Sequence, residues 1–213
     1  MTEHSPSPFK IFAGAFDLWW RNWVVLAAIN VVWALCCLSV ALGPPATLAA
    51  YDVANSLARG EDAGMRDFWQ AGQEHFLLGW KWFLSNVIVA LLIASSLHFY
   101  AGLGTLWSTW LWALTLSLGA LWLTVQFYAL PYLLEQREKR LLHAYRNALF
   151  TVLASPLYTL VLLGMTLLIA ALSVMLVALL FLGGPCLIAV LASAAVQDRL
   201  RAYGVLGGQQ DGL

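Results

Sequence analysis

The chain has 213 residues, of which 62% are hydrophobic and 10% are charged, and its 11 basic side chains balance its 11 acidic ones. Soluble globular domains carry about a quarter of their residues as charges, so this composition excludes an ordinary soluble fold and indicates an integral membrane protein. A nucleic-acid partner would need a basic surface, and the balanced charge argues against one.

The basic residues fall into four short patches, separated by long apolar stretches. The patches are Lys10 and Arg21; Arg59, Arg66 and Lys81; Arg137, Lys139, Arg140 and Arg146; and Arg199 with Arg201. Basic residues beside apolar spans mark the cytoplasmic side of a membrane, so the pattern predicts three helical hairpins and a cytoplasmic C-terminus. We expect one all-α polytopic membrane bundle over residues 1–213, with five to six membrane segments and short disordered tails at about 1–8 and 204–213.

The first hairpin, over about residues 22–58, can be interpreted in two ways. A clear apolar span, WVVLAAINVVWALCCLSVAL, ends at Gly43, Pro44 and Pro45, and a short helix follows it. That helix either returns through the membrane, buried by its neighbours, or lies on the cytoplasmic surface. The first alternative gives six segments and a cytoplasmic N-terminus; the second gives five and an external one. A second Gly-Pro break, at Gly183, Gly184 and Pro185, is also followed by a short helix ending in arginine, and this similarity favours six.

The remaining elements follow from charge and periodicity. MRDFWQAGQEHFL, which begins at Met65, has apolar residues at helical spacing and predicts an amphipathic helix in the interface. Residues 82–134 carry no charge and are long enough for two crossings, with a turn at about 100–105. The third hairpin spans about 148–198, with one long helix before the second Gly-Pro break and a shorter one after it.

One segment resembles a known family. The run PATLAAYDVANSLARGED, followed by RDFW and by His75 and Phe76 before a new span, is similar to the YesL-like family of small bacterial membrane proteins. The distinctive motifs lie within about residues 43–76. The doubled Pro44 and Pro45, and His75 in place of an asparagine, depart from the family pattern. The resemblance implies a bacterial inner-membrane location and an accessory role beside a carbohydrate uptake system.

Polar side chains at membrane depth are the candidate functional residues, because they are costly to bury there. They are Asn30, Asp52, Asn55, Asn86, Gln126 and Gln197. A buried Asp52 would need a partner such as Arg59, whereas a surface Asp52 would not. Three of the amides, Asn30, Asn86 and Gln126, suit hydrogen bonds between helices.

The sequence lacks the usual catalytic, phosphate-binding and metal-binding motifs. There is no HExxH, Gly-rich phosphate loop or GxSxG, and neither the histidines nor the three cysteines have metal-ligand spacing. We expect no cofactor and no metal, and interpret Glu135 and Glu138 as part of a solvated cytoplasmic loop. The sequence therefore predicts a non-enzymatic accessory or scaffold protein, with lipids or a second copy as partners; a sugar transport system is the partner that the family resemblance implies. The alternative is a small solute transporter or channel whose path runs between the Gly-Pro-broken helices, lined by Asp52 and Gln197.

Overall fold

The computed structural model describes residues 8–175 and 184–202, and within them it contains nine helices and no strand. The all-α prediction is therefore confirmed for this part of the chain. The helices are α1 (Pro8–Arg21), α2 (Trp23–Leu38), α3 (Gly43–Arg59), α4 (Met65–Glu74), α5 (Phe76–Leu103), α6 (Leu106–Glu135), α7 (Leu141–Ala154), α8 (Pro156–Met175) and α10 (Gly184–Ala202). The predicted tails, apart from Pro8, lie outside the described residues.

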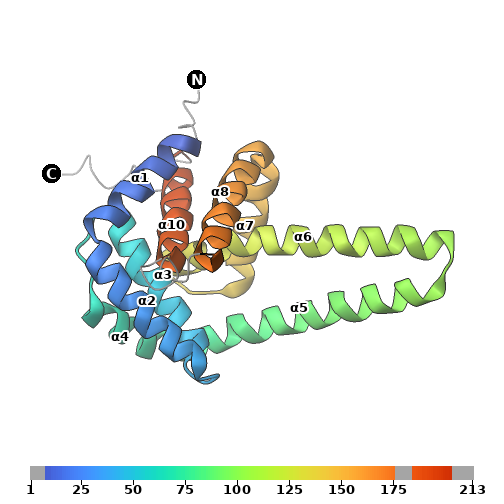
Figure 1. Cartoon of the computed structure of the whole chain (residues 1–213), viewed down its shortest axis with the longest axis horizontal. Coiled ribbons are helices and arrows are strands. Elements are labelled where there is room, and N and C mark those ends of the chain that lie inside the picture. Colours follow the sequence, from blue (N-terminus) through green and yellow to red (C-terminus); the bar gives the residue numbers. More distant parts are fainter. Residues whose placement is uncertain (1–7, 176–183, 203–213) are drawn as a thin grey trace.

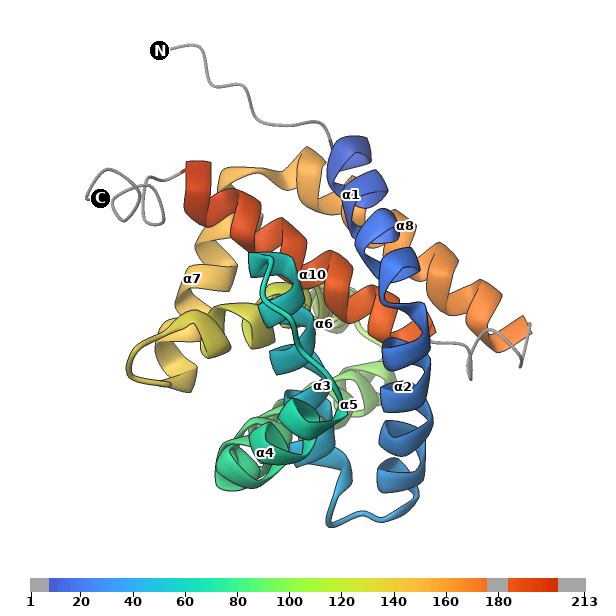
Figure 2. The same ribbon diagram turned by 90° about the vertical axis from the view of Figure 1, so that its left-hand side faces the viewer.

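Two long helices, α5 and α6, form an antiparallel hairpin that extends away from a body made by the other helices (Figure 1). The chain turns at Gly104, whose φ of 60° favours glycine, and the Thr105 side chain caps α6 by accepting a hydrogen bond from the Ser108 backbone nitrogen. This confirms the predicted helical pair and its turn. Figure 2 looks along the hairpin, and α2, α8 and α10 run across that view.

Three of the described helices are long and apolar enough to cross a membrane: α5, α6 and the Pro156–Ser173 part of α8. The pair α1 and α2 would make a fourth, but these helices are bent by 87° at Asn22. Three to four candidate spans are thus fewer than the five to six expected from the sequence. The difference arises because α2 has 16 residues and α3 has 17, each near 25 Å of helix, short of the roughly 30 Å core, and because α10, with 19 residues, carries Asp198, Arg199 and Arg201 near its end.

The short helix α3 lies at the centre of the body. Its apolar face, with Leu48, Val53 and Leu57, is buried, and it packs most extensively against α10 and also against α2, α4 and α5. This agrees with burial by neighbouring helices, the first of the two sequence interpretations. Whether α3 crosses a membrane stays a prediction.

The two helices that follow the Gly-Pro breaks are neighbours in space, since α3 and α10 pack against each other. Gly43, Pro44 and Pro45 form the first turn of α3, while Gly184 and Pro185 open α10; Gly183 lies outside the described residues. Proline suits a first turn because its missing N–H is unpaired there in any helix. At Gly79 of α5, an added Cβ would lie 2.9 Å from backbone atoms of Pro44 and Pro45, so the start of α3 touches the α5 backbone.

Two further elements differ from expectation or refine it. The long helix expected in the apolar run before the second break is present as α8, which Pro156 starts after α7 ends at Ala154; the proline ring disfavours a helical conformation at Ser155. The predicted amphipathic helix is present as α4, with Phe68 buried, Trp69 exposed and the helix packed on α3.

Candidate functional site

A buried carboxylate joins three helices of the body. One oxygen of Glu135, Oε1, accepts hydrogen bonds from Asn55 Nδ2 at 2.7 Å, Gln197 Nε2 at 2.8 Å and Arg59 Nη1 at 2.9 Å. The Glu135 side chain is 12% exposed and that of Arg59 is 32% exposed. We call Glu135, Asn55, Arg59 and Gln197 the carboxylate cluster.

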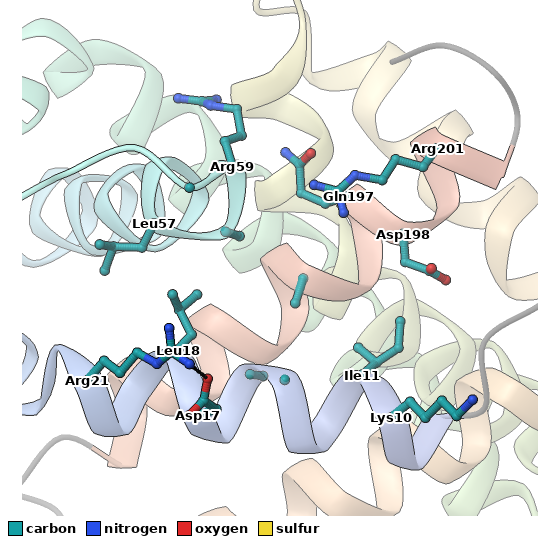
Figure 3. Close-up of a pocket in the computed structure, with 15 residues that line it drawn as sticks. Lys10, Ile11, Asp17, Leu18, Arg21, Leu57, Arg59, Gln197, Asp198 and Arg201 are labelled. Atoms are coloured by element: carbon teal, nitrogen blue, oxygen red, sulfur yellow. Dashed lines mark ion pairs between the residues drawn. The ribbon is translucent and has the colours of Figure 1, made fainter. Parts of the chain in front are cut away.

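Local helix geometry brings these groups together. Asn55 and Arg59 are four residues apart on α3, so both side chains lie on one face of that helix. Glu135 is the last residue of α6, and Gln197 lies in the C-terminal half of α10. Figure 3 shows Arg59 and Gln197 on their neighbouring helices. The helix α3 ends directly after Arg59, because Gly60 adopts a left-handed conformation with φ of 85° and its N–H bonds back to the Leu57 and Ser56 carbonyls.

Arg59 also binds a surface carboxylate. Its Nε and Nη2 atoms donate to the two oxygens of Glu61, each at 2.9 Å. The hydrogen bonds from this guanidinium lower the pKa of Glu61. Arg59 thus connects the buried Glu135 to the exposed loop after α3.

A second polar group surrounds His75, between α4 and α5. Lys139 Nζ lies 2.7 Å from His75 Nε2, and carboxylate oxygens of Asp52 and Glu74 each lie 4.0 Å from the imidazole. Burial, and then the charge of Lys139, lower the pKa of His75, while Asp52 and Glu74 act in the opposite direction. The lowered pKa favours the neutral imidazole, whose Nε2 can accept a hydrogen bond from the Lys139 ammonium.

The structure separates the six predicted site residues. Asn55 and Gln197 meet in the carboxylate cluster, whereas Asp52 is part-exposed beside His75. Arg59, the partner expected for a buried Asp52, is bound to Glu135 and Glu61. Asn30 is buried in α2 and accepts a hydrogen bond from Cys186 Sγ at 3.7 Å.

Asn86 and Gln126 hold the hairpin together. The Trp122 indole donates to Asn86 Oδ1 and the Trp82 indole donates to Gln126 Oε1, each at 3.1 Å. Each bond joins α5 to α6, which is the packing role expected from the sequence.

The two Gly-Pro-started helices also border a small cavity. A hollow of about 210 Å³ lies between α2, α3 and α10, and its lining includes Asn30, Trp33, Thr47, Tyr51 and Cys186. The Trp33 indole donates to Thr47 Oγ1 at 3.1 Å. The cavity wall thus combines aromatic rings with amide and hydroxyl groups.

Sequence reasoning missed two polar residues that bind within the body, Glu135 and His75. The interpretation of Glu135 as a solvated loop residue is wrong, since it is the last residue of α6, its side chain is only 12% exposed, and its Oε1 accepts three hydrogen bonds. A signal was present, because Glu135 is the first charged residue after the uncharged stretch 82–134. In the described part of the chain, no three His, Cys, Asp or Glu side chains are grouped in a way that could hold a metal ion.

Comparison with known proteins gives one match. Residues 26–97, from α2 to most of α5, match the family model described as "Protein of unknown function, DUF624". This region contains residues 43–76, where the YesL-like motifs lie. No curated protein and no solved structure matches the chain.

Proposed function

We propose that this chain is a multi-pass bacterial inner-membrane protein without enzymatic activity, and that it acts as an accessory or scaffold component. The observation that carries the proposal is the uncovered hairpin. Only 6% of the most apolar stretch of α5 and 28% of that of α6 is buried within the chain. An apolar surface of this length needs lipid or another protein to cover it.

The hairpin also indicates which residues of α5 and α6 lie at the membrane boundary. Residues 82–103 and 106–127 each give about 33 Å of helix, enough for the hydrocarbon core. The hydrogen-bonded Trp82 and Gln126 stand at one end of this interval, and Lys81 comes immediately before it. Tryptophan favours either membrane interface and lysine favours the cytoplasmic one, so the carboxylate cluster lies on the cytoplasmic side in this arrangement.

The finer topology is part of the same proposal. With both termini cytoplasmic, the chain has six segments, and this number requires α3 and α10 to act as short segments buried by their neighbours. The packing of α3 against α10, α2 and α5 supports this reading. A tag at Thr2 should then be inaccessible from outside intact cells, and external labelling there would refute the six-segment topology.

A carbohydrate uptake system is the partner that we propose. The support is the YesL-like motif region, which the DUF624 match includes; YesL-like proteins carry this same family model. The scaffold role needs a rigid base for the hairpin, and the carboxylate cluster supports one by tying α3, α6 and α10 to a single oxygen.

The test is photo-crosslinking in living cells. A photoreactive residue at Leu91 or Leu92, both exposed on α5, should crosslink to a transport protein that also co-purifies in mild detergent. The same residue at buried Leu133 is the matched control and should give no adduct. Recovery of the chain alone, with no adduct at either exposed position, would overturn the accessory role.

The second candidate is a small transporter or channel, which the cavity beside the Gly-Pro-started helices favours. Aromatic rings with amide and hydroxyl groups suit a neutral polyhydroxylated solute. Reconstituted vesicles would separate the two functions. Sugar flux that is lost with Asn30→Ala and kept with Asn86→Ala, outside the cavity, supports transport; no flux with sugars or ions favours the accessory role.

A further inference from the structure

An apolar groove lies where the hairpin meets α7. It has a volume of about 590 Å³, and its walls come from α5, α6 and α7. The lining residues are Val89, Ile93, Leu118, Leu121, Trp122, Val125, Leu142, Tyr145, Arg146 and Leu149. We call this hollow the lipid groove.

The polar groups beside the lipid groove are already bonded within the protein. Tyr145 Oη lies 2.6 Å from Ser85 Oγ, and the Trp122 indole donates to Asn86. The Tyr145 and Trp122 rings also contact each other, with centroids 4.9 Å apart. The groove therefore presents hydrocarbon to its occupant and offers little to a polar solute.

The groove extends over about half of the hydrocarbon core. Val125 lies next to Gln126, at the proposed cytoplasmic boundary, and Ile93 is 11 residues beyond Trp82. At 1.5 Å per residue, Ile93 is about 16 Å deep, close to half of a core of roughly 30 Å. One leaflet's acyl chains cover this same depth.

A basic side chain stands at the groove. Arg146 is exposed, and no ion pair of it occurs among residues 8–175 and 184–202. Two nearby basic residues differ, because Arg140 pairs with Glu138 at 2.8 Å and Lys139 is bonded to His75. Arg146 can therefore reach toward headgroups while its stem lies along the apolar wall.

We infer that the lipid groove binds an acyl chain of an anionic phospholipid from the cytoplasmic leaflet, with the lipid phosphate on Arg146. Anionic lipids are attracted by basic residues at this surface, by about fivefold in local concentration for each residue. The inference rests on the proposed membrane crossing of the α5–α6 hairpin.

The test uses the full chain in vesicles of phosphatidylethanolamine and phosphatidylglycerol, with a photoreactive group on the acyl chain of either lipid. At Ile93 and Leu121, phosphatidylglycerol should label about fivefold more than phosphatidylethanolamine. At the exposed Leu92 and Leu111, which lie outside the groove, the two lipids should label equally. Arg146→Gln should abolish the preference for phosphatidylglycerol, and Arg140→Gln should leave it unchanged.

A blocking variant tests the groove without altering charge. Leu118→Trp should remove the enriched labelling, whereas Leu116→Trp, on the exposed surface of the same helix, should keep it. Labelling spread evenly over groove and exposed leucines would overturn the inference. Gly102→Cys, at an exposed position beside the turn with open space around it, separates this failure from that of the proposed topology. External labelling there supports the crossing whatever the lipid result, and its absence overturns the crossing and the groove assignment together.

Discussion

Replacing Glu135 by alanine should destabilise the body strongly, because one carboxylate oxygen serves three donors. The change leaves the Asn55 and Gln197 amides without their acceptor and costs about 1 kcal/mol for each. The lost pair with the part-exposed Arg59 adds about 1 kcal/mol. The sum, about 3 kcal/mol, corresponds to a fall in Tm of roughly 6–12 °C for a chain of this size.

The assay is thermal unfolding of the purified protein in detergent, followed by circular dichroism. Glu138→Ala is the matched control, since Glu138 lies in the following loop and is 76% exposed; it should change Tm by about 1 °C or less. A decrease in Tm of less than about 2 °C for Glu135→Ala would refute the reasoning.

A double-mutant cycle tests whether the loss of stability comes from the hydrogen bonds within the carboxylate cluster. Asn55→Ala should cost about 1 kcal/mol in the wild-type background and close to nothing once Glu135 is alanine. Equal costs in both backgrounds would show that Asn55 contributes by packing and not through Glu135.

Two further predictions concern pH and close packing. The lowered pKa of His75 means that the unfolded chain takes up a proton near pH 6.5 before the folded protein does, so stability is present above that pH and is lost on acidification through the folded pKa. His75→Gln should flatten the dependence of Tm on pH between 7 and 5, and the exposed His143→Gln should not; parallel curves for wild type and His75→Gln would contradict this. Gly79→Ala should lower stability by about 1–3 kcal/mol in denaturant unfolding, because its Cβ meets the α3 backbone, whereas Gly164→Ala, with open space around it, should be neutral or stabilising. An equal effect of the two changes would rule out close packing as the cause.

The sequence predicted elements whose signals are local. The uncharged stretch 82–134 and its glycines at 102 and 104 predicted α5, the turn and α6, and the apolar spacing from Met65 predicted α4. These features depend on periodicity, charge and backbone freedom, each of which can be read within about 30 residues.

Other features depend on which helices meet, and hydropathy does not encode that. Glu135 appears solvated in a chain of alternating charges, and only the approach of Asn55 and Gln197 buries it. The 87° bend near Asn22 was missed for the same reason, since it places α1 against α10. The separate helix α7 before Pro156 was not predicted, whereas α8 begins where the apolar run starts.

The place of α10 in the chain has a consequence for the order of assembly. α10 follows every other described helix in the sequence, yet α3 packs more extensively against α10 than against any other helix. The Gln197 side chain of α10 also donates a hydrogen bond to Glu135. Synthesis proceeds from the N-terminus, so the hairpin can enter the membrane while the buried face of α3 still lacks its cover. A nascent chain paused before residue 184 would expose that face to chaperones and proteases. The face is covered only once α10 has been synthesised and packs against α3.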